Sequence, residues 1–279
     1  MKRLGALAAV AVIAACGVQG AREVKSVALP SMKDVSPAAW ERLAESRIYF
    51  GHQSVGDNIL KGVAAILQGE SGIRLAVVKG DTAAALDRPA LVQSAIGVNG
   101  EPDSKTKAFD SIVRSGVGGR ADIAFFKFCF WDIRASTDVA AVFRLYKQVH
   151  EALRRDYPAT TFVHVTVPLS VHRDGIRQRL KALLGEVDAW DLDNAKRSEL
   201  NDLIVREYEG KEPVFDVALA ESTLPGGVRS TFAMGGKAVP CLAAEYSRDG
   251  AHLNDRGARW VAEQFLITLA RVAEGRGGR

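Results

Sequence analysis

The sequence predicts an α/β fold built on a mainly parallel β-sheet. Short apolar runs alternate with longer amphipathic segments along most of the chain, which is the pattern of repeated strand and helix units. The run Ile123–Phe130 is broken only by Lys127, as expected for a central strand that is covered on both faces. With 279 residues, 47% hydrophobic and 25% charged, the chain can bury a large core. It shows no internal repeat or long linker, so we expect one globular domain.

The elements follow from local patterns. A helix is predicted to begin at Pro37, because Ser36 can cap it and proline is favoured in the first turn. The strands predicted after it are Arg47–Phe50, Ile73–Lys79, Ile123–Phe130, Thr161–Val167 and Val214–Val217. The predicted helices are Asn58–Leu67, Lys107–Ser115, Val139–Asp156, Arg173–Leu184, Asn194–Tyr208 and Arg256–Ala273. The glycines of Pro225–Gly227 and Met234–Gly236 predict a long mobile loop before the last predicted helix.

The N-terminus has the pattern of a targeting segment. Lys2 and Arg3 precede the apolar run Leu4–Ala15, which is shorter than the roughly 20 residues that a membrane-spanning helix needs. The run ends in Ile-Ala-Ala-Cys16, which resembles a bacterial lipobox and implies cleavage before Cys16 and attachment of lipid to its thiol. An ordinary alanine-rich signal peptide is the alternative. Removal of Lys2 and Arg3 would lower the formal net charge from +4 to +2.

The predicted organisation follows from this segment. Residues 1–15 are expected to be a lipoprotein signal peptide, 16–45 a lipid tether and N-terminal helix, and 46–279 the globular domain. The expected location is the bacterial cell envelope, with the protein bound to the membrane by its lipid. Because Gly17 rather than Asp follows Cys16, we expect the outer membrane, facing the periplasm, in a Gram-negative cell.

Composition argues against several other functions. Lysine and arginine are scattered rather than clustered, so no nucleic-acid partner is expected. No cofactor is expected, because the chain lacks a P-loop and a glycine-rich dinucleotide motif in its strand–helix setting. The histidines lack metal-ligand spacing and the three cysteines form no CxxC pair, so no metal is expected. Whether Cys129 and Cys241 form a disulfide stays open.

Residues with chemical potential lie in loops after strands. In open parallel sheets, ligands bind beyond the carboxyl ends of the strands, where several loops converge. The four candidate loops are Gly51–Gly56, Gly97–Asp103, Trp131–Arg134 and Arg248–Leu253.

The strongest candidates are a serine early in the chain and an Asp-x-x-His motif near its end. Ser54 lies at a strand-to-helix turn, where free backbone N–H groups favour a developing oxyanion. Asp249 and His252 directly precede the last predicted helix, and a carboxylate near a histidine can orient it to accept a serine proton. Taken singly, Ser54 is more often a helix cap, Asp249 part of a turn, and His252 a surface histidine.

Together these motifs resemble the SGNH or GDSL-type hydrolases. Asp249-Gly250-Ala251-His252 matches the motif that this family carries before its C-terminal helix. The serine block differs, because Gly51-His52-Gln53-Ser54 stands where the family has Gly-Asp-Ser. The resemblance implies a three-layer α/β/α sandwich with a mainly parallel central sheet. It also implies that Ser54 is the nucleophile, His252 the general base and Asp249 the orienting carboxylate.

The family's oxyanion-hole asparagine is missing. In the family a Gly-x-Asn-Asp block follows the central strand, whereas this chain has Cys129-Phe130-Trp131-Asp132. We therefore expect the oxyanion to be stabilised by N–H groups near Ser54 and by the loop after a neighbouring strand. The candidates for oxyanion stabilisation or substrate binding are Gly56, Gly97, Asn99, Gly100, His52, Gln53 and Asp132. For His52, Gln53 and Asp132, a local structural role is the alternative.

The function expected from the triad and the family resemblance is that of a serine esterase. Its substrates would be small acyl esters, with O-acetyl groups on carbohydrate as one candidate. Two alternatives remain: an O-acyltransferase that uses the same triad, and a non-catalytic glycan-binding lipoprotein.

Overall fold

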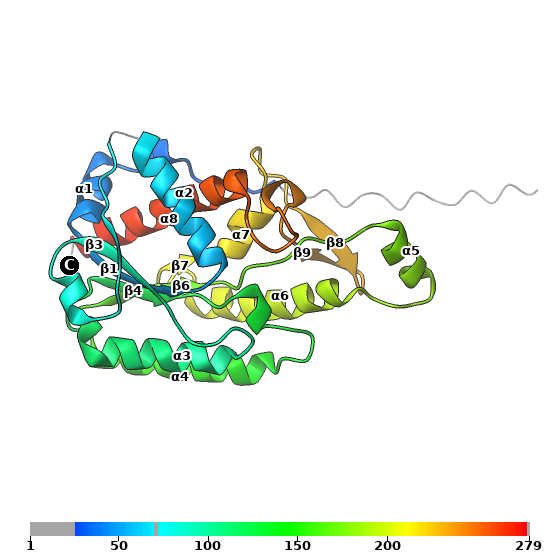
Figure 1. Cartoon of the computed structure of the whole chain (residues 1–279), viewed down its shortest axis with the longest axis horizontal. Helices are drawn as coiled ribbons and strands as arrows, with labels where there is room; N and C mark the ends of the chain where they lie inside the picture. Colours follow the sequence, from blue (N-terminus) through cyan, green and yellow to red (C-terminus); the bar gives the residue numbers. More distant parts are fainter. Residues whose placement is uncertain (1–25, 70–71, 278–279) are drawn as a thin grey trace, which may run out of the picture.

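The computed structural model describes residues 26–69 and 72–277, which form a three-layer α/β/α sandwich (Figure 1). The central sheet has the strand order β2-β3-β1-β4-β5, and every pairing in it is parallel. Its strands are β1 (Arg47–His52), β2 (Val77–Lys79), β3 (Ala90–Ala95), β4 (Ile123–Phe126) and β5 (Thr161–Phe162). The predicted fold class is confirmed. The predicted signal peptide and Cys16 lie outside the described residues.

Helices cover both faces of the sheet (Figure 1). One face carries α1 (Pro37–Glu45), α2 (Val55–Gly69), α7 (Val217–Ser222) and α8 (Asp255–Arg276). The other carries α3 (Pro102–Ile112), α4 (Val139–Asp156) and α6 (Ala189–Tyr208). Within β1, Ile48 and Phe50 belong to the first core and Tyr49 to the second, because successive strand residues point to opposite faces.

Several elements differ from the sequence prediction. The segment predicted as one strand from Thr161 is split into β5 and β6 (His164–Val165), and β6 pairs in parallel with β7 (Val214–Phe215). The sequence analysis missed β3 and α7. The predicted mobile loop is wrong: β8 (Thr231–Met234) and β9 (Lys237–Pro240) form an antiparallel hairpin, whose turn is Gly235-Gly236. Both glycines have positive φ, a conformation that they adopt without steric cost. The remaining helix, α5 (Ile176–Leu183), lies outside the layers at one end of the molecule (Figure 1).

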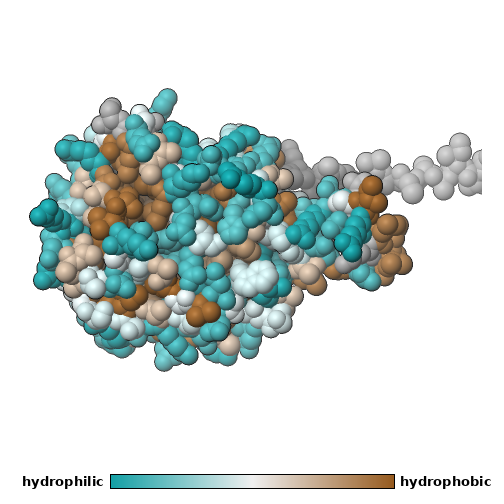
Figure 2. All heavy atoms as spheres, in the orientation of Figure 1, coloured by the Kyte–Doolittle hydropathy of each residue, from teal (hydrophilic) through white to brown (hydrophobic). Residues whose placement is uncertain are grey.

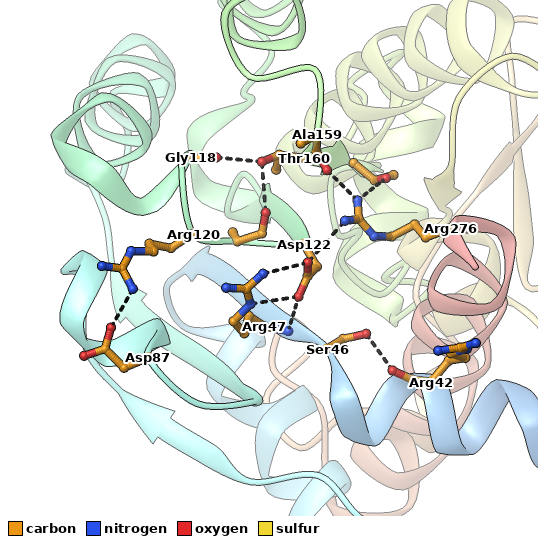
Figure 3. A network of polar contacts seen from close by, with 12 residues as sticks. Arg42, Ser46, Arg47, Asp87, Gly118, Arg120, Asp122, Ala159, Thr160 and Arg276 are labelled. Carbon is orange, nitrogen blue, oxygen red and sulfur yellow. Dashed lines mark hydrogen bonds and ion pairs between the residues drawn. The ribbon is translucent and has the colours of Figure 1, made fainter. Parts of the chain in front are cut away.

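A network of charged residues holds the amino ends of the strands (Figure 3). Arg47, at the start of β1, donates through its backbone N–H and its guanidinium to the carboxylate of Asp122, directly before β4, at 2.9 to 3.1 Å. Arg276, in the last turn of α8, donates to Asp122 Oδ1 and to the carbonyl of Ala159, two residues before β5. The C-terminal end of α8 is thus fixed to the side of the sheet where the strands begin. The loops that follow the strands lie on the opposite side.

Close packing of α2 against α8 joins the two ends of the chain. A Cβ at Gly62 in α2 would lie 2.1 Å from the carbonyl oxygen of Ala258 in α8, so only glycine allows this approach. Because Ser54 directly precedes α2 and His252 lies just before α8, this contact brings both residues to one place. Among the described residues, no helix is long and apolar enough to span a bilayer.

Candidate active site

Ser54 lies in a sharp turn between β1 and α2. Its φ of 56° makes it the one non-glycine residue with a positive φ in the described part of the chain. A left-handed conformation costs a residue with a side chain roughly 1–2 kcal/mol, so the surrounding structure must hold it in place. The turn places the hydroxyl beside the N-terminus of α2, where backbone N–H groups are unpaired within the helix.

Ser54, His252 and Asp249 form a continuous hydrogen-bonded triad. Ser54 Oγ lies 2.6 Å from His252 Nε2, and His252 Nδ1 lies 2.7 Å from Asp249 Oδ2. An ionised carboxylate only accepts hydrogen bonds, so Nδ1 carries the proton and Nε2 is free to accept the serine O–H. The structure thus brings the three predicted catalytic residues together.

Asp249 remains ionised in this arrangement. Its partial burial alone would raise its pKa, but the backbone N–H groups of His252 and Ala251 and the imidazole outweigh that effect and lower the pKa to about 2. The two N–H groups donate to Asp249 Oδ1 at 2.8 and 2.9 Å. The rings of His252 and Phe130 pack edge to face, with their centroids 5.4 Å apart. The outer side of the triad stays open to solvent, because the His252 and Asp249 side chains are about half exposed.

The available oxyanion donors differ in part from those predicted. Within the described ranges, the backbone N–H groups of Ser54 and Gly97 have no hydrogen-bond acceptor. The N–H of Gly56 instead donates to the Gln53 carbonyl at 3.1 Å, and that of Gly100 donates to Asp132 Oδ1 at 2.8 Å. Since both of these groups are already satisfied, the prediction that Gly56 and Gly100 stabilise an oxyanion does not fit the structure.

Asn99 offers a third donor. Its Oδ1 accepts a hydrogen bond from Lys105 Nζ at 2.7 Å, whereas its exposed NH₂ group has no acceptor in the described part of the chain. Lys105 also forms an ion pair with Asp132 at 2.7 Å, and both of these side chains are 0% exposed. The hydrogen bond from Lys105 to Oδ1 thus fixes the amide of Asn99, and its NH₂ group remains able to donate to a ligand.

The other three candidates have structural roles in this arrangement. Gln53 Nε2 donates to the carbonyls of Ile96 and Gly97 at 2.8 and 2.6 Å, so its amide hydrogens tie the serine loop to the loop after β3. His52 is buried and contacts Gln93 through Nε2 at 3.0 Å. Burial, with the nearby charge of Lys127, lowers the pKa of His52 to about 4.

Asp132 joins two loops from within the core. Its carboxylate accepts the backbone N–H groups of Cys129 and Gly100 in addition to the ammonium of Lys105. Sequence reasoning missed Lys105, because a lysine in a helix is ordinarily exposed and no local pattern marks it as buried.

The rim of the site is aromatic. Trp131 is exposed, and its indole lies beside Gly100, where a Cβ would be 3.5 Å from the ring. The guanidinium of Arg134 lies 4.0 Å from the indole centroid. The rim therefore presents a large flat ring and a cation next to the candidate oxyanion loop.

The two cysteines in the described part of the chain form no disulfide. Cys129 and Cys241 are buried free thiols. The residues that the structure describes hold no group of three or more histidine, cysteine or acidic side chains that could bind a metal ion.

Comparison with known proteins gives distant structural similarity. No protein-family model and no curated protein matches the chain. It is similar to a GDSL-like lipase from Bacteroides thetaiotaomicron, with 11% identity and a TM-score of 0.48 over 87% of this chain and 99% of that one. It is also similar to a Streptococcus pneumoniae structure whose description names a platelet activating factor, with 16% identity and a TM-score of 0.46 over 83% and 91% of the chains. An acetyl esterase mutant with acetate ion gives 13% identity and a TM-score of 0.40 over 82% and 97%. At these values the chemistry must be argued from the geometry of this chain.

Proposed function

We propose that the chain is a serine ester hydrolase of a divergent SGNH type. The observation that carries this proposal is the 2.6 Å contact between Ser54 Oγ and His252 Nε2, with Asp249 bound to the other ring nitrogen. A serine used only as a helix cap would not need a histidine in the tautomer that accepts its proton. The positive φ of Ser54 supports the same interpretation, because strained backbone is concentrated at functional sites.

The reaction would proceed through an acyl-enzyme. Ser54 Oγ attacks the ester carbonyl carbon while its proton passes to His252 Nε2, and Asp249 stabilises the imidazolium that forms. The tetrahedral adduct then collapses, the C–O bond to the alcohol breaks, and the alcohol leaves with the proton from Nε2. Water attacks the acyl carbon and gives its proton to Nε2, which returns it to Ser54 Oγ as the carboxylic acid departs.

The negative oxygen of both tetrahedral adducts needs donors. The N–H groups of Ser54 and Gly97 and the NH₂ group of Asn99 are among the donors without an acceptor in the described loops around the serine, and we assign them this role. Each preorganised donor is worth about 10²–10³ in turnover.

The proposed substrates are small acyl esters. The partly exposed triad suits an ester on a larger alcohol that remains outside the protein. The exposed ring of Trp131 favours a carbohydrate alcohol, since sugar rings pack against aromatic faces. We also propose that the chain is tethered to the bacterial envelope through Cys16. Support for that tether comes from the sequence pattern alone.

Labelling and turnover test the proposal together. A fluorophosphonate probe should label the wild-type protein and not Ser54→Ala, and Ser54→Ala should lower kcat on an acetyl ester by about 10⁴–10⁶. Ser115→Ala is the matched control, because Ser115 is exposed and bonds only to the carbonyl of Ile112. A folded wild-type protein that neither reacts with the probe nor cleaves esters would refute the proposal and favour a binding protein. Faster acyl release on addition of a sugar acceptor would identify a transferase.

A further inference from the structure

Helix α5 carries large apolar side chains that the protein does not bury. Three of them recur at positions i, i+4 and i+7, which places them on one face of the helix, and the fourth follows directly after its last residue. These residues are Ile176 (80% exposed), Leu180 (58%), Leu183 (83%) and Leu184 (78%). None belongs to a hydrophobic core of the described residues. Figure 1 shows α5 projecting from one end of the molecule, and Figure 2 shows hydrophobic side chains at that end.

The charge of α5 is of one sign. The helix contains Arg177, Arg179 and Lys181 and no acidic residue. An apolar face together with basic residues is the pattern of a helix that lies in a membrane interface, where the apolar side enters the acyl region and the cations meet anionic headgroups.

Short contacts connect the segment before α5 to the catalytic loop. The backbone N–H of Val171 donates to the Gly250 carbonyl at 2.8 Å, between Asp249 and His252. The Arg173 guanidinium lies 3.4 Å from the Trp190 ring centroid, and a Cβ at Gly250 would lie 2.8 Å from the same ring. These contacts fix the segment before α5 to the loop that carries Asp249 and His252.

The N-terminal chain enters at the same end of the molecule. The backbone N–H of Val27 donates to the Gly227 carbonyl at 2.9 Å, near the start of hairpin β8–β9. The hairpin, the segment before α5 and Gln178 of α5 line a common cavity of about 370 Å³. Cys16 precedes Ser26 by ten residues, which reach at most about 36 Å when extended. A lipid on Cys16 and α5 can thus reach one membrane surface.

We propose that α5 docks the protein on the surface of an anionic lipid bilayer. The helix lies in the interface with Ile176, Leu180, Leu183 and Leu184 inserted among the acyl chains, and it holds the catalytic loop close to the membrane. This contact is independent of the lipid on Cys16 and of the ester chemistry.

A fluorophore placed on α5 tests the contact at one position. The full chain carries Cys16→Ser, so that no lipid is attached, and Leu183→Cys labelled with a polarity-sensitive dye. The other two cysteines are buried. The matched control is Arg120→Cys, also exposed, at the amino ends of the strands (Figure 3). Vesicles of phosphatidylglycerol and phosphatidylcholine should shift the emission at position 183 to the blue and leave position 120 unchanged. Adding Arg177→Gln should raise the half-saturating lipid concentration about fivefold, because one basic residue near such a surface contributes about 1 kcal/mol.

Three outcomes would overturn the proposal. Vesicles that sediment the chain without shifting the dye at position 183 would show binding without α5. Equal shifts at both positions would show nonspecific adsorption. A blue shift without lipid that grows with protein concentration would show that a second copy of the chain covers the helix.

Discussion

Replacing Lys105 with methionine should reduce both stability and turnover, through two different contacts. Lys105 Nζ lies 2.7 Å from Asp132 Oδ2 and 2.7 Å from Asn99 Oδ1. Methionine keeps the unbranched apolar part of the side chain up to Cε and removes the ammonium group with its charge and its donors. The substitution therefore separates the electrostatic role of Lys105 from its packing.

The stability loss follows from the burial of the pair. Removing one partner of a buried ion pair costs about 3–5 kcal/mol, because the other charge is left uncompensated. Asp132 keeps the N–H groups of Gly100 and Cys129, so we expect the lower end, about 3 kcal/mol. The matched control is Arg120→Met, which breaks an exposed pair with Asp87 and should cost at most about 1 kcal/mol.

The turnover loss depends on Asn99. Without the ammonium, the amide of Asn99 is free to rotate, and losing one oxyanion donor costs about 10²–10³ in kcat. KM should change little, because the donor acts mainly on the adduct. Asn99→Ala should lower kcat by the same factor. The double variant Asn99→Ala/Lys105→Met should have the same kcat as Asn99→Ala alone.

Urea unfolding and hydrolysis of an acetyl ester measure these effects at a temperature where all variants are folded. If Lys105→Met lowers kcat equally in the wild-type and Asn99→Ala backgrounds, Lys105 does not act through Asn99 and the assigned oxyanion donor is wrong. A loss of less than 1 kcal/mol in stability would contradict the buried ion pair.

Three further substitutions test other parts of the structure. Asp249→Asn should lower kcat by about 10⁴ with little change in melting temperature, because an amide no longer fixes the tautomer of His252; unchanged kcat would exclude the proposed catalytic triad. Burial raises the pKa of Glu221 to about 8, so between about pH 4.3 and 8 the folded state keeps a proton that the unfolded chain has lost, and stability falls as pH rises. The melting temperature of Glu221→Gln relative to wild type should accordingly increase from pH 5 to pH 8, and a constant difference would contradict the shift. Gly62→Ala should cost about 1–3 kcal/mol in urea unfolding and also reduce kcat, because its Cβ forces α2 away from α8; Gly69→Ala, which has open space around it, should do neither.

The elements that the sequence predicted well have local signals. Helix α1 begins at Pro37 with Ser36 capping Ala39, and α4 has the bounds Val139–Asp156 that its apolar period predicts. The triad was also predictable, because a turn serine and an Asp-x-x-His motif are short patterns. The 2.6 Å distance between Ser54 Oγ and His252 Nε2 could not be predicted from the sequence. It depends on the packing of α2 against α8, which lie far apart in the chain.

Strand β3 was missed because its polar residues are satisfied by distant partners. Gln93 contacts His52 Nε2 at 3.0 Å, and the Ser94 hydroxyl lies 2.7 Å from the Tyr49 hydroxyl. In the sequence these two polar residues interrupt the apolar run and remove the signal of a buried strand. The hydrogen bonds that offset the free-energy cost of burying these polar groups come from residues of β1, which is distant in sequence.

The same reasoning explains how a divergent oxyanion site can be assembled. On the loop after β4, Trp131 occupies the position at which the SGNH-type hydrolases that the motifs resemble have an asparagine. This loop therefore offers no side-chain amide at that position. Asp132 instead reaches back from it to bind the Gly100 N–H and the Lys105 ammonium, and Lys105 in turn binds Asn99. The buried pair thereby fastens the loop after β3 onto the loop after β4, on either side of β1, and the hydrogen bond from Lys105 holds Asn99 in place on the first of these loops. In the proposed site, the amide donor that the loop after β4 lacks is supplied by the loop after β3, on the far side of β1, and this arrangement requires that the buried partners Lys105 and Asp132 stay together.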